Sequence, residues 1–204
     1  MAPHLFLPFT PNGKSTELKA VEVKRRLGIS AQDPVDPFKI LPQIPARLFD
    51  PDEFRRASPI LACALFSVHR TAWDAVGFGR IGARGESIIL LNPTAAKTRQ
   101  RATLMEEVVH IVLDHPKTEL PVSHSGNGST PALAWTRPYD TAIEDEAYNV
   151  GAACLLPYPS LFQAVNARHE HATVIAEQAG LSTDHVIYRI KRAGLSRIYH
   201  KHCA

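Results

Sequence analysis

The amino-acid sequence predicts an α+β domain in which a small antiparallel sheet precedes two long helices and a shorter helical segment. Three closely spaced runs rich in β-branched and aromatic residues lie in the first half of the chain, and short connections favour antiparallel pairing. Beyond them the apolar residues recur at the three- and four-residue spacing of a helix. The predicted strands are residues 60–66, 76–81 and 87–91.

Length and composition indicate a folded domain. The 204 residues are 45% hydrophobic, enough to bury a core and to form one domain with a small appendage. No apolar run approaches the ~20 residues that a membrane helix needs, so we expect no membrane partner. The N-terminal stretch has no cationic region and no small-residue cleavage site, and we expect no secretory signal.

The cysteines and the net charge indicate the cellular compartment and whether nucleic acid is a partner. Cys63, Cys154 and Cys203 lie far apart without a C-x-x-C pair, which is typical of free thiols in the cytoplasm. A net charge of +3 does not by itself indicate nucleic acid. Residues 189–201 hold five Lys or Arg and no acid, and we interpret them as a solvated helix face. We therefore expect weak or no direct nucleic-acid binding.

The first predicted helix begins at a cap formed by Ser15 or Thr16, runs through Leu27 and stops at Gly28. Prolines between residues 33 and 45 then permit only short helices and extended turns. Residues 1–32 are therefore assigned to an N-terminal helix and arm, 33–158 to the main domain and 159–204 to a C-terminal helical segment.

Two long helices are predicted in the second half of the chain. The first spans residues 94–114 and ends before Pro116, and the second spans residues 141–156 and is stopped by Pro157. Between them, residues 117–140 are rich in Ser, Gly, Pro and Thr, which predicts a long surface loop. The apolar residues that give the first helix its period are Leu104, Val108, Ile111 and Val112.

The C-terminal segment is similar to a helix-turn-helix over residues 172–190. Gly180 would make the turn, Ser182 would cap the second helix, and Val186 and Ile190 would face the core. A packing or substrate-docking module fits this pattern as well as a DNA reader does.

A candidate metal site begins on the first long helix. Glu106 and His110 lie four residues apart, so they share a face and can point at one ion. Glu107 lies one position round, where a carboxylate can act as a general base without being a ligand. In H-E-x-x-H metallopeptidases two histidines bind zinc in this way. A solvated glutamate pair on an amphipathic helix is the commoner origin of an E-E-x-x-H string.

The second long helix strengthens the hypothesis. Glu144, Asp145 and Glu146 precede a run of small and apolar residues that allows two helices to approach closely. A glutamate from a neighbouring helix is the usual third ligand where the first helix gives two. Acids in a first helical turn also suit the helix dipole, which is the alternative interpretation.

At these residues the chain resembles the ImmA/IrrE family of metallo-endopeptidases. Residues 87–93 match a family strand that ends in Asn, 101–115 match its Arg-x-x-Thr-x-x-His-Glu-x-x-His helix, and 144–157 match its second helix. The likeness covers roughly residues 36–192. The chain differs from the family pattern at three positions. It has Glu106 where the family has the first histidine, Tyr148 where the family has Asn, and Val150 where the family has Phe.

The resemblance implies a zincin-like fold in which Glu106, His110 and Glu144 hold the metal and Glu107 is the base. The ion would be zinc, or a harder divalent ion such as manganese, because a second carboxylate makes the site richer in oxygen. The substrate would be a protein, by resemblance a DNA-binding repressor in a stress-response, mobile-element or toxin–antitoxin circuit. The alternative is a non-catalytic pseudo-peptidase that binds a protein partner or DNA.

Three further residues are predicted to lie around the candidate ligands. Tyr148, Glu146 and His115 are candidates for contacts around the ligands. Glu146 is about 200° round the helix from Glu144, and His115 is about 140° from His110, so neither is a natural co-ligand. We interpret His115 as a helix C-terminal histidine. Three other histidines carry less weight as ligands, namely His124, His169 and His171.

Overall fold

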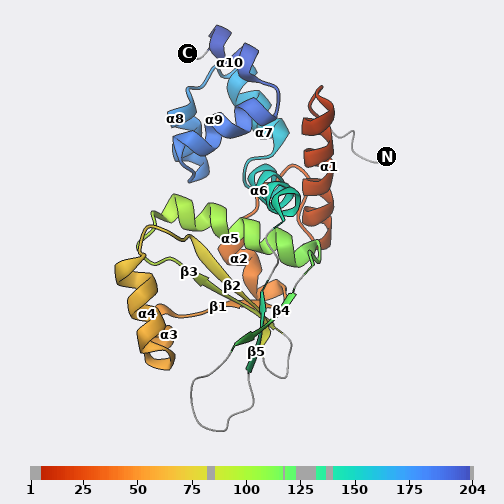
Figure 1. Ribbon diagram of the computed structural model, residues 1–204. Helices are drawn as coiled ribbons and strands as arrows, with labels where there is room; N and C mark the ends of the chain where they lie inside the picture. Colours follow the sequence, from red (N-terminus) through yellow and green to blue (C-terminus); the bar gives the residue numbers. More distant parts are fainter. Residues whose placement is uncertain (1–5, 82–85, 117, 123–131, 137–139, 203–204) are drawn as a thin grey trace.

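The computed structural model describes residues 6–81, 86–116, 118–122, 132–136 and 140–202. Helices form most of the molecule, and the strands gather below α5 in the view of Figure 1. The α-helices are α1 (Pro11–Arg26), α2 (Pro37–Ile40), α3 (Pro51–Ala57), α4 (Pro59–Cys63), α5 (Lys97–Val112), α6 (Thr141–Leu155), α7 (Tyr158–Phe162), α8 (Ala172–Ala179), α9 (Thr183–Arg192) and α10 (Ser196–His202). The strands are β1 (Ala46–Leu48), β2 (Ala75–Ile81), β3 (Glu86–Leu91), β4 (Thr118–Val122) and β5 (Ala132–Thr136).

The larger sheet has three strands in the order β1-β3-β2. β2 runs antiparallel to β3, with Ala75 opposite Leu91, as the sequence predicts. β1 runs parallel to β3, with Ala46 opposite Ser87, so the sheet is mixed and not purely antiparallel. The sequence gives little sign of β1, because this strand has three residues and directly follows the proline-rich stretch.

Residues 60–66 are helical and not a strand, which corrects the prediction. They form α4 and a π-helical turn, Ala64–Val68. Pro59 occupies the start of α4, a favoured place for proline. The buried residues Ala62 and Phe66 lie four apart, whereas Ile60 is 89% exposed, which is the burial pattern of a helix. A short apolar run does not distinguish the two structures by itself.

The predicted loop over residues 117–140 also contains regular structure. β4 and β5 form an antiparallel pair in which Thr118 lies opposite Thr136. Residues 117, 123–131 and 137–139, and therefore His124, lie outside the described part of the chain. The Ser and Gly content of this segment favours a loop. It gives no sign of two strands this short, because strand formation depends on the partner strand as well as on local composition.

The long helices agree closely with prediction. α5 and α6 begin and end within three residues of the expected positions. α1 begins earlier than expected, because the Thr10 hydroxyl accepts a hydrogen bond from the Gly13 N–H at 3.2 Å and Pro11 follows it. In the C-terminal segment Gly180 has φ 63° and the Ser182 hydroxyl accepts from the His185 N–H at 3.2 Å, so the turn and the cap are confirmed.

A close helix crossing holds α5 against α6. A Cβ added at Gly151 would lie 3.4 Å from the backbone nitrogen of Glu106, so a side chain here would press on the α5 backbone. Neighbouring residues of both helices, including Met105, Val109 and Ala153, are buried in one apolar core. The prediction that small residues allow close approach is confirmed, and this crossing places the acidic start of α6 beside α5.

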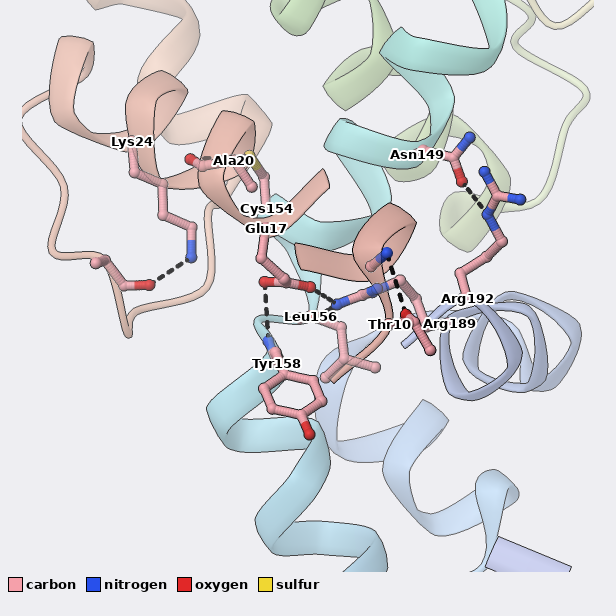
Figure 2. Close-up of polar contacts among 12 residues, drawn as sticks. Thr10, Glu17, Ala20, Lys24, Asn149, Cys154, Leu156, Tyr158, Arg189 and Arg192 are labelled. Atoms are coloured by element: carbon pink, nitrogen blue, oxygen red, sulfur yellow. Dashed lines mark hydrogen bonds and ion pairs between the residues drawn. The ribbon is translucent and has the colours of Figure 1, made fainter. Parts of the chain in front are cut away.

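The first and ninth helices are joined through a buried ion pair between Glu17 and Arg189 (Figure 2). Arg189 donates to the carbonyl oxygen of Leu156 from Nε at 3.2 Å, and Glu17 accepts from the backbone N–H of Tyr158 at 3.3 Å. Both charged side chains are almost fully buried. Elements from the two ends of the chain therefore meet at the end of α6.

Two of the three cysteines lie within the described residues. Cys63 is exposed and Cys154 is buried, both as free thiols, and burial raises the pKa of Cys154 to about 12. Cys203 lies outside the described residues. Across the described ranges we find no helix with the length and apolarity needed to cross a bilayer.

Candidate metal centre

The turn from β3 into α5 is fixed by Asn92. Its side-chain amide donates to the carbonyl oxygens of Arg70 at 2.6 Å and Trp73 at 2.8 Å, and its Oδ1 accepts from the N–H of Thr94 at 3.0 Å. Gln100 of α5 donates back to the Asn92 carbonyl oxygen at 3.0 Å. Asn92 is buried, so these bonds set where α5 starts relative to the sheet.

α5 and α6 bring the three predicted ligand residues together. One donor atom from each of Glu106, His110 and Glu144 lies within 4.8 Å of the other two. Nε2 of His110 is 3.3 Å from Oε2 of Glu144. Within the part of the chain that the structure describes, no other group of three His, Cys, Asp or Glu residues meets this criterion.

Burial differs among the three residues. His110 is fully buried, whereas Glu106 and Glu144 are half-buried. The Glu144 side chain is 26% exposed. The N-terminal end of α6 is fixed by Asp140, whose Oδ1 accepts from the N–H of Ala142 at 2.8 Å. The histidine is thus held in the core while the carboxylates border accessible space.

The donor set suits a divalent cation. An imidazole nitrogen and two carboxylate oxygens are ligands that zinc and manganese both accept, and their close spacing leaves room for an ion between them. Two adjacent carboxylates repel each other, and a shared cation relieves that repulsion.

Glu107 lies against the edge strand β2. It is buried, and a Cβ added at Gly77 would come within 2.9 Å of its Oε2 atom. Any larger residue at position 77 would displace this carboxylate. Sequence reasoning missed Gly77, although a glycine inside a β-type run is a recognised sign of close approach.

His115 packs directly on His110. Their Nδ1 atoms are 2.8 Å apart, and the rings meet nearly edge to face. The reason is local: Asp114 has φ 53°, and the N–H of His115 donates to the carbonyl oxygen of His110 at 3.0 Å, which is the Schellman ending of a helix. The angle counted along an ideal helix does not apply, because α5 ends at Val112.

Glu146 and α1 extend this contact to the surface. Oε1 of Glu146 is 3.7 Å from Nε2 of His115, and the other carboxylate oxygen pairs with Lys19 of α1. The structure therefore places the predicted supporting residues His115 and Glu146 next to each other. Sequence reasoning missed Lys19, because no local pattern indicates which face of α1 meets α6.

Tyr148 lies one turn beyond Glu144 and is held by α9. Its ring centroid is 5.0 Å from that of Tyr188 and 6.1 Å from that of His185. Burial raises the pKa of Tyr148. The positive charge of Arg99 lowers this pKa, and the negative charge of Glu106 raises it further. The phenol is therefore a neutral hydrogen-bond donor at ordinary pH. Burial also lowers the pKa of His185 to about 4, helped by the nearby arginines.

The remaining histidines lie elsewhere among the described residues. His169 stacks on His202, with ring centroids 4.6 Å apart. His171 caps α8, and its Nδ1 accepts from the N–H of Thr173 at 3.4 Å. Neither belongs to the group that can hold an ion.

Comparison with known protein families gives a match. A family model described as the IrrE N-terminal-like domain, a peptidase family, matches residues 68–191, more than half of the chain. The matched region contains the three candidate ligands and Glu107, whereas α1 lies outside it. No curated protein matches the chain.

Proposed function

Because the chain belongs to the IrrE N-terminal-like peptidase family, we propose that it is a metal-dependent endopeptidase that makes limited cuts in a protein substrate. The observation that carries the proposal is the convergence of Glu106, His110 and Glu144, with the buried Glu107 adjacent to Glu106 in sequence. We assign the fold to the zincin-like class on the same grounds.

Glu106, His110 and Glu144 would hold the ion. When bound, a divalent ion supplies a Lewis acid that polarises a peptide carbonyl and makes a water molecule more acidic. Two carboxylates neutralise the charge of a dication, whereas the family's two histidines and one glutamate leave it positive. The Glu106 variant therefore favours a harder ion such as manganese, and we expect slow turnover with zinc.

Glu107 would be the general base. Its carboxylate accepts a proton from the attacking water and returns it to the leaving amine, so that no net charge is created. Gly77 lets this carboxylate lie at the edge of the sheet. β2 is an outer strand of the three-stranded sheet.

The preferred substrate class is a DNA-binding repressor, as the family resemblance implies. The residues of α9 that face inward, including Val186 and Ile190, are buried in the core, and Asp184 in its first turn would repel phosphates. The acidic first turn supports weak or no direct nucleic-acid binding, and we propose a packing or docking role for the helix-turn-helix-like segment.

A cleavage assay tests the proposal. Metal-free protein and protein reconstituted with zinc or manganese are incubated with the repressors encoded beside it, and products are read by mass spectrometry. We expect a single cut that requires the ion. A non-catalytic pseudo-peptidase is the second candidate, favoured by the glutamate at position 106. It would bind a repressor stably in both forms without cutting it.

Glu106→His should raise zinc affinity by about tenfold or more, a gain of about 1.4 kcal/mol, because imidazole suits zinc better than a second carboxylate does. Cleavage with zinc near neutral pH should rise as well. The measurement is zinc affinity by chelator competition together with the cleavage rate. Glu177→His, which adds a histidine on the exposed face of α8, is the control. Unchanged zinc affinity would mean that residue 106 does not face the ion.

A further inference from the structure

A chain of four side chains leads from the metal centre to the N-terminal helix. His110 Nδ1 lies 2.8 Å from His115 Nδ1, His115 Nε2 lies 3.7 Å from Glu146 Oε1, and Glu146 pairs with Lys19. His110 is fully buried and His115 is buried, whereas Glu146 and Lys19 reach the surface. The chain crosses from α5 through its C-terminal turn to α6 and then to α1.

The short distance between the two Nδ1 atoms requires that one proton lie between the two rings. A neutral imidazole carries one N–H, so one ring must donate and the other must accept. Nε2 of His110 is the atom that faces Glu144, and it must be deprotonated to bind an ion. With an ion bound at Nε2, Nδ1 of His110 would carry the proton and donate to Nδ1 of His115.

The position of the proton on His115 depends on Glu146. With its Nδ1 accepting, neutral His115 carries its proton on Nε2, the atom that faces the Glu146 carboxylate. At 3.7 Å this is an electrostatic attraction longer than a hydrogen bond. Lys19 holds the carboxylate from the other side. The Glu146 carboxylate thus favours the proton on Nε2 of His115, which leaves Nδ1 of His115 as an acceptor and favours a lone pair on Nε2 of His110 for the ion.

We propose that His115 is a positioning residue that fixes the ring orientation and tautomer of His110, and that Glu146 with Lys19 of α1 holds His115 in place. This inference rests on the proposed function, because it assumes that His110 binds an ion. It makes α1, which lies outside the matched peptidase domain, part of the support of the metal centre.

Substitution of His115 or Lys19 should lower the metal affinity by different factors. Partners that orient a ligating histidine typically change metal affinity by about 10–100-fold when removed. His115→Phe should therefore weaken zinc binding by about that factor. His115→Asn keeps an acceptor near the Nδ1 position and should stay within about threefold of wild type. Lys19→Met removes only a half-exposed ion pair and should cost at most about fivefold.

The experiment measures zinc affinity of the full chain without a His tag by chelator competition. The visible spectrum of the cobalt form reports ligand geometry independently of affinity. His200→Phe, the same replacement at an exposed histidine of α10, is the matched control. Thermal unfolding of the metal-free proteins separates a loss of folding from a loss of positioning.

The expected result is weak binding and an altered cobalt spectrum for His115→Phe, recovery in His115→Asn and wild-type behaviour in the control. Equal affinity of His115→Phe and wild type would overturn the proposal. Equal loss in the Phe and Asn variants, with metal-free folding intact, would also overturn it, since the acceptor would then be irrelevant. A wild-type protein that binds no ion would instead refute the proposed function itself.

Discussion

Glu107→Gln is expected to lower the cleavage rate by about 10²–10⁴-fold while leaving metal binding unchanged. Glutamine has nearly the same shape as glutamate and can occupy the same space against Gly77. Its amide cannot take a proton from water, so the base is lost without the loss of a ligand. A large fall in rate at constant metal content is the signature of that role.

The measurement compares initial cleavage rates of the metal-reconstituted proteins and their metal content by elemental analysis. Glu53→Gln on α3, the same change at an exposed glutamate, controls for the loss of one charge. Cleavage by Glu107→Gln at the wild-type rate would show that another group is the base. Loss of the ion together with activity would place Glu107 among the ligands.

Arg189→Met is expected to lower the free energy of unfolding by about 3–5 kcal/mol, the second large effect. The substitution leaves Glu17 buried without its partner and takes a donor from the Leu156 carbonyl oxygen (Figure 2). The loss arises mainly from the stranded charge. Removing both charges in Glu17→Met with Arg189→Met should therefore recover most of it.

Urea unfolding at constant pH measures both variants. Arg197→Met on α10, an exposed arginine, is the control and should change the free energy of unfolding by less than about 0.5 kcal/mol. If Arg189→Met were as stable as this control, the ion pair would not connect α1 to α9. If the double variant were less stable than either single variant, the loss would come from the separate contacts of the two side chains and not from a stranded charge.

Local pattern was enough to predict the long helices and the convergence of the three candidate ligand residues. The period of Leu104 and Val108 defines the buried face of α5, and four-residue spacing puts Glu106 and His110 on one side of it. Gly151 and its small neighbours indicated the crossing with α6 that brings Glu144 near. These features depend on residues close together in sequence.

What the sequence could not predict depends on distant contacts or on a single backbone angle. The left-handed conformation of Asp114 turns His115 back onto His110, and a non-glycine residue gives little warning of it. Lys19 meets Glu146 across more than a hundred residues of sequence. In residues 60–66 the apolar run fits a strand and a helix equally well, and only tertiary packing decides.

A calorimetric titration of zinc and of manganese into the metal-free, untagged protein tests the central claim most directly. The wild type should bind a single ion per chain, and Glu144→Gln and His110→Gln should each abolish that binding while the fold, read by circular dichroism, is retained. His169 is exposed and lies outside the candidate group, so it should not contribute a second tight site. No binding by the wild type, or unchanged binding in both variants, would contradict the metal centre described above.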